Sequence, residues 1–111
     1  MSERKIDPNE AVDYIIKNAE KFARAKADRI YIEHYRSSLK SILMKRSGEK
    51  VIAAQEREAY AHDEYSELLD GLREAVEVEE KLRWDLIAAQ ARIEVWRSQE
   101  ASNRAQDKLT L

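Results

Sequence analysis

The chain has 111 residues, of which 43% are hydrophobic and 38% charged, and its formal net charge at pH 7 is −2. Two glycines and one proline are too few for a protein of many short strands, and the absence of cysteine excludes disulfides, thiol nucleophiles and cysteine-ligated zinc. The composition therefore predicts a single all-α domain, residues 1–111, whose long helices bury narrow stripes.

The N-terminal residues MSERKIDPNE are charged and lack an apolar core of the kind found in signal peptides. No stretch approaches the roughly 18 consecutive apolar residues that are needed to span a bilayer. We therefore expect a cytoplasmic protein that is neither secreted nor inserted in a membrane, with residues 1–6 frayed.

The first helix is expected to begin at Asp7-Pro8, because Asp7 suits the N-cap, Pro8 suits the first helical position and Glu10 completes a capping pattern. It should run to about Arg46, where Ser47-Gly48 provides a C-terminal stop. Its apolar residues fall in two groups that lie nearly opposite each other at 100° per residue. The first group is Val12, Ile15, Ile16, Ala19, Phe22, Ala23 and Ile30, and the second is Tyr31, Tyr35, Leu39, Ile42 and Leu43. Either the helix breaks near residues 24–31 or its halves pack against different partners, and the second reading is favoured because no Gly or Pro lies between Ala19 and Ser47.

Residues 49–61 are helix-prone and predict a short connecting helix or the first turns of the next one. Asp63 is expected to cap a long helix that continues to about Asn103, with residues 105–111 frayed. Gly71 inside this helix costs about 1 kcal/mol relative to alanine, so a close helix–helix approach there is a reasonable expectation.

The long helix carries a heptad seam, in which steps of three and four residues alternate over more than four heptads. Its members are Tyr65, Leu68, Leu72, Ala75, Glu79, Leu82, Leu86, Ala89, Ile93 and Trp96. This spacing predicts coiled-coil-like packing in an elongated helical hairpin. Glu79 at a seam position is expected to set register or partner choice at some cost in stability.

A second apolar line, separate from the seam, lies on the same helix and predicts that the protein forms homo-oligomers. A helix that is apolar on two sides needs two neighbours, and a hairpin supplies only one. The candidate oligomer interface combines both lines: Leu82, Trp84, Leu86, Ile87, Ala88, Ala91, Ile93, Val95 and Trp96. Which line closes the hairpin and which joins subunits stays open, as does the subunit number. The alternative is a three-helix fold in which residues 49–61 cover the second line.

Charge is distributed unevenly along the chain. Residues 1–50 contain 12 Lys and Arg against 8 Asp and Glu, whereas residues 51–111 contain 8 against 14. The simpler explanation of this asymmetry is that the basic half and the acidic half of the chain pair with each other. The alternative is a surface for nucleic acid, in which Lys17, Lys21 and Arg24 follow phosphates and nearby tyrosines stack on unpaired bases.

Nothing in the sequence points to catalysis, a cofactor or a small-molecule substrate. There is no glycine-rich phosphate loop and no nucleophile elbow, and neither His34 nor His62 stands in a metal-binding pattern. We therefore expect a non-enzymatic protein without a bound metal.

Two stretches, Lys21–Arg36 and Tyr60–Arg104, resemble a family of small helical proteins encoded by tailed bacteriophages and prophages. The resemblance implies a bacterial cytoplasm and a setting in DNA recombination or replication, and it brings no catalytic or ligand residues with it. The sequence as a whole predicts a self-assembling phage accessory or adaptor protein that binds another phage or host protein. A direct single-strand or duplex DNA-binding protein is the alternative.

Overall fold

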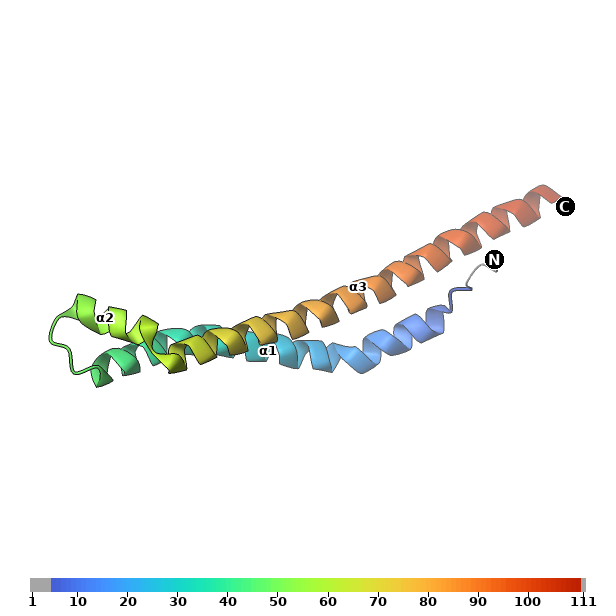
Figure 1. Cartoon of the computed structure of the whole chain (residues 1–111). Coiled ribbons are helices and arrows are strands. Elements are labelled where there is room, and N and C mark those ends of the chain that lie inside the picture. Colours follow the sequence, from blue (N-terminus) through green and yellow to red (C-terminus); the bar gives the residue numbers. More distant parts are fainter. Residues whose placement is uncertain (1–4, 111) are drawn as a thin grey trace. The chain divides into compact units, whose positions relative to one another are not determined.

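The computed structural model describes residues 5–110, and every element in that range is helical. Helix α1 spans Pro8–Arg46, α2 spans Ile52–Ala61 and α3 spans Asp63–Thr110 (Figure 1). The prediction of an all-α helical hairpin with a short connecting helix is confirmed. Among the described helices, none combines the length and the apolar character that crossing a membrane requires.

Local signals define both ends of α1 as predicted. The backbone N–H of Asn9 donates to Asp7 Oδ1 at 2.9 Å, so Asp7 is the N-cap. At the other end, Gly48 has a φ of 74°, a left-handed conformation that favours glycine after a helix. Ser47 reinforces this stop, because its backbone N–H and its hydroxyl both donate to the Met44 carbonyl.

A one-residue break separates α2 from α3. His62 has an extended backbone, with φ −71° and ψ 141°. Its Nδ1 accepts a hydrogen bond from the backbone N–H of Glu64 at 3.1 Å, so His62 caps α3. The expectation that Asp63 is the cap was wrong by one residue, because Asp63 is already the first helical residue.

The chain divides into two compact units. Among the described residues, the terminal unit contains residues 5–22 and 81–110, and the turn unit contains Ala23–Glu80. Helices α1 and α3 contribute residues to both units.

The turn unit has a small apolar core where its three helical segments meet. Leu39 and Leu43 of α1 pack with Ala59 of α2, and Met44, Tyr65 and Leu68 surround them. Two interactions extend this contact at the surface of α2: the Lys40 ammonium lies 4.8 Å from the Tyr60 ring centre and 3.6 Å from Glu56. Helix α2 is therefore fixed against α1 and the start of α3.

The terminal unit pairs the first turns of α1 with α3. Ala11 and Ala89 are both buried, and Tyr14 of α1 lies beside Asp85 of α3. Small side chains at the two buried positions allow the helices to approach closely.

The predicted seam of α3 is the inward face of the helix. All of its members are buried or half-buried: Tyr65, Leu68, Leu72, Ala75, Glu79, Leu82, Leu86, Ala89, Ile93 and Trp96. Heptad spacing therefore identified this face correctly along both units.

The predicted change of sides in α1 is not observed, because α1 is continuous and has one inward line with heptad spacing. The buried and half-buried residues of this line are Ala11, Ile15, Asn18, Phe22, Ala25, Arg29, Ile32, Leu39 and Leu43. Two positions of this line, Asn18 and Arg29, are polar, so the line appears interrupted when only apolar residues are considered. Exposed residues such as Ile16 and Tyr31 flank this line on different sides and produced the apparent switch.

The C-terminal end also differs from expectation. Residues 105–110, which were expected to fray, continue α3 as far as Thr110. No glycine or proline follows Gly71, and Lys108 in the last turn complements the helix dipole. Residues 1–4 and 111, for which fraying was also expected, lie outside the described residues.

Candidate interaction surfaces

The second apolar line of α3 lies on the exposed side of the helix, and we call it the outer face. It consists of Trp84, Ile87, Ala88, Ala91 and Val95. Trp84 is 58% exposed and Val95 is 46% exposed, although both are large apolar side chains. The residues recur at helical spacing, so they form one continuous surface within the terminal unit.

The structure divides the nine predicted interface residues into two sets. Leu82, Leu86, Ile93 and Trp96 are half-buried on the inward seam, whereas the five outer-face residues are exposed. The alternative in which residues 49–61 cover the outer face does not describe this structure, because α2 packs into the turn-unit core. The outer face is therefore the part of the predicted interface that is available to another molecule.

Charged side chains border the outer face. The Arg83 guanidinium lies 4.9 Å from the Trp84 ring centre, and Lys81 Nζ donates to Asp85 Oδ2 at 2.8 Å. The hydrogen bond from Lys81 holds the pKa of Asp85 below its usual value, and burial together with the Asp85 charge raises the pKa of Tyr14. This border is charged at neutral pH, and the rim of a protein–protein interface is usually polar as well.

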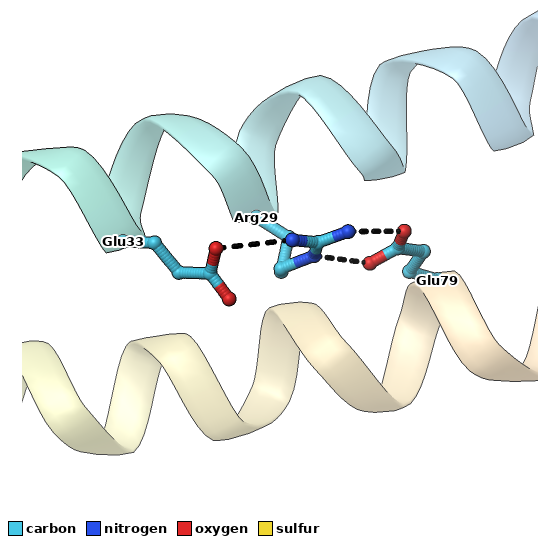
Figure 2. A network of polar contacts seen from close by, with 3 residues as sticks. All are labelled: Arg29, Glu33 and Glu79. Carbon is cyan, nitrogen blue, oxygen red and sulfur yellow. Dashed lines mark hydrogen bonds and ion pairs between the residues drawn. The ribbon is translucent and has the colours of Figure 1, made fainter.

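An ion pair between half-buried Arg29 and buried Glu79 crosses the seam of the turn unit, and sequence analysis missed it. Arg29 donates to Glu79 through two parallel bonds, Nε to Oε2 at 2.6 Å and Nη2 to Oε1 at 2.9 Å (Figure 2). Its third nitrogen, Nη1, donates to Glu33 Oε2 at 3.0 Å. These hydrogen bonds, led by the one to Glu79, raise the pKa of Arg29, so the pair stays charged.

The pair gives the predicted role of Glu79 a physical basis. Glu79 is only 7% exposed, and a buried carboxylate is strongly unfavourable unless a cation meets it. Sliding α1 along α3 would separate it from Arg29, so the pair favours one register. The signal in the sequence was the acid itself, because a carboxylate at a seam position needs a polar or cationic partner on the facing helix.

The three candidate nucleic-acid contacts are all exposed on α1. Lys17 and Lys21 lie in the terminal unit and Arg24 in the turn unit. Arg24 already takes part in an interaction within the chain, so Lys17 and Lys21 are the stronger candidates. Of the nearby tyrosines, Tyr14 is half-buried against Asp85, whereas Tyr31 is exposed and stacks on Tyr35.

Within residues 5–110 no group of three or more side chains is arranged to hold a metal ion. His34 is exposed, and His62 serves as the cap of α3. The chain matches no protein-family model, no curated protein and no solved structure.

Proposed function

We propose that this protein is a non-enzymatic adaptor that forms homo-oligomers through the outer face of α3. The observation that carries the proposal is the exposure of this apolar face beside a seam that already packs inward. A contiguous apolar surface rimmed by charge is typical of a protein–protein interface.

A second copy of the chain is the simplest partner for this face. Most soluble oligomers are symmetric, and an isologous contact uses the same patch on both subunits. In the outer face, small Ala88 and Ala91 lie between larger Trp84 and Val95. Alanines at the centre let two helices approach closely, and a tryptophan beside them provides the aromatic anchor that such interfaces use.

The cellular setting of the proposal rests on the resemblance to small phage and prophage proteins. That resemblance suggests a bacterial cytoplasm and a role beside DNA recombination or replication proteins. In this setting, a self-assembled helical protein would present several copies of its remaining surfaces to a phage or host partner.

The experiment is a mass measurement by light scattering and sedimentation at micromolar concentrations. The wild-type protein should exceed the 13.0 kDa of one chain. Ala91→Lys places a charge at the centre of the outer face and should yield a helical monomer, because Ala91 is exposed in the single chain. Ile52→Lys is the matched control, because Ile52 is an exposed apolar residue on α2. A monomeric wild-type protein, or an Ala91→Lys variant with unchanged mass, would contradict the proposal.

Direct DNA binding is a second candidate, favoured by the exposure of Lys17 and Lys21 on α1. Phosphate contacts weaken steeply as salt rises, so binding to single-stranded or duplex oligonucleotides should be compared between low and physiological salt. Changing Lys17, Lys21 and Arg24 together to Glu should abolish that binding and leave helicity intact. Binding that survives the triple change would exclude this site.

A further inference from the structure

A groove lies between α1 and α3 within the turn unit. Its volume is about 400 Å³, and its least exposed lining residue is Ala25, which is buried; Ile32, Gly71 and Ala75 are half-buried. Tyr31 and Val78 form its exposed apolar part, at 69% and 54% exposure. Ligand pockets span about 300–1,000 Å³, so this groove suits one or two side chains and not a large cofactor.

Gly71 keeps the groove open. A Cβ atom built at this position meets no atom within 4 Å, so no close approach inside the chain requires glycine. Among the described residues Gly48 alone has a positive φ, so Gly71 is not needed for its backbone conformation either. Glycine weakens a helix interior relative to alanine. Because neither a close contact nor the backbone conformation requires glycine at this position, the feature that distinguishes Gly71 is the open space beside it.

The charge of the groove is negative. Asp28 and Glu74 line it, and neither carboxylate has a cationic partner within residues 5–110. The exposed Tyr31 ring lies beside them, stacked on Tyr35 with 6.2 Å between ring centres. Two unpaired carboxylates and an aromatic face are complementary to a cation with an apolar stem.

We propose that this groove binds an arginine side chain presented by a basic, amphipathic segment of a partner protein. Arginine fits better than lysine because its planar guanidinium stacks on an aromatic ring and donates to two carboxylates at once. The apolar residues of the segment would cover Val78 and Tyr31. The inference goes beyond self-assembly, because it concerns a different unit of the chain and a different partner.

The two glycines provide a direct test by NMR. Glycine amides resonate in their own region of a ¹H–¹⁵N spectrum, and this chain has only Gly48 and Gly71. The probe is a blocked helical peptide with leucines on one face and arginines at i and i+4 beside them, and its control carries glutamate at both arginine positions. The arginine peptide should shift the Gly71 signal saturably and leave Gly48 unchanged, and the glutamate peptide should shift neither. Equal shifts with both peptides, or no shift of Gly71 at millimolar peptide, would overturn the proposal.

Variants separate the groove from a general acidic attraction, with calorimetry as the readout. Gly71→Leu fills the open space and should weaken peptide binding at least tenfold, while Gly71→Ala, its control, should retain most of the affinity. Both variants should be at least as helical as the wild type, so loss of binding cannot be ascribed to unfolding. Glu74→Gln should weaken binding several-fold. Unchanged affinity in Gly71→Leu would show that the peptide binds elsewhere.

Mass measurements on the same variants distinguish this inference from the proposed function. Ala91→Lys should lower the mass of the protein and still bind the peptide, because the groove lies in the turn unit. If Gly71→Leu lowers the mass instead, the groove is occupied by a second copy of the chain, and the proposal of a separate arginine-bearing partner is overturned.

Discussion

The two tryptophans of α3 should respond differently to truncation, because they lie on different faces of the helix. Trp96 is half-buried on the inward seam, and Trp84 is exposed on the outer face. Trp96→Ala should therefore destabilise the fold of a single chain. Trp84→Ala should leave that fold nearly unchanged and weaken the association of subunits.

The magnitudes follow from exposure. A tryptophan side chain buries at most about 250 Å², so the 58% exposure of Trp84 leaves about 145 Å² for a partner to cover. At about 25 cal/mol per Å² this area corresponds to at most about 3.6 kcal/mol. Because a partner covers only part of this area, Trp84→Ala should lose about 2 kcal/mol of association free energy. This loss raises the dissociation constant about 30-fold. A well-buried tryptophan loses about 3–5 kcal/mol of unfolding free energy on truncation to alanine, and the incomplete burial of Trp96 lowers the expected loss to about 2–3 kcal/mol.

Sedimentation over a concentration series measures association, and thermal or denaturant unfolding at low protein concentration measures the fold. Ile52→Ala is the control for removing an exposed apolar residue outside the outer face. Oligomerisation itself stabilises a fold by mass action, so unfolding must be compared under conditions where all variants are monomeric. The reasoning is refuted if Trp84→Ala destabilises the monomer as much as Trp96→Ala does, or if Trp84→Ala leaves the dissociation constant unchanged.

Three further predictions concern single contacts. Arg29→Leu should lower the melting temperature because it removes the two hydrogen bonds that Arg29 donates to buried Glu79, and adding Glu79→Leu should restore part of the loss. Melts that show no recovery in the double variant would contradict this. His62→Ala should cost about 0.5–1 kcal/mol in denaturant unfolding through loss of the α3 cap, and His62→Asp should not. The lowered pKa of Asp85 means that its contribution to stability is present above about pH 4 and disappears as the pH falls through the folded-state pKa. Asp85→Asn should therefore flatten this part of the stability-versus-pH curve, and an unchanged curve would count against the contact with Lys81.

Much of the fold could be predicted because its signals are local. The N-cap at Asp7 and the stop at Gly48 depend on a few neighbouring residues, and the structure contains both. The seam of α3 depends only on the distances between apolar residues along one helix, and each of its members is buried or half-buried. The periodic spacing of apolar residues therefore identifies the apolar face of a helix even when the partner of that face is not known.

The parts that sequence analysis missed depend on residues that are distant in the chain. Arg29 looks like a surface residue until Glu79, 50 positions away, is placed opposite it. That pairing made the inward line of α1 polar at one point and concealed its heptad spacing. The open space beside Gly71 also requires the facing helix, because a glycine alone does not show whether another chain segment fills it.

The sequence by itself determined the helices, most of their boundaries and the existence of two apolar faces on α3, because helix caps and helical periodicity act over a few residues. Only the tertiary structure decided which of these faces packs inward, since burial depends on where α1 lies. It placed Leu82, Leu86, Ile93 and Trp96 on the inward face and exposed Trp84 and its neighbours. It also created the acidic groove beside Gly71, because a groove between two helices exists only once both walls are in place.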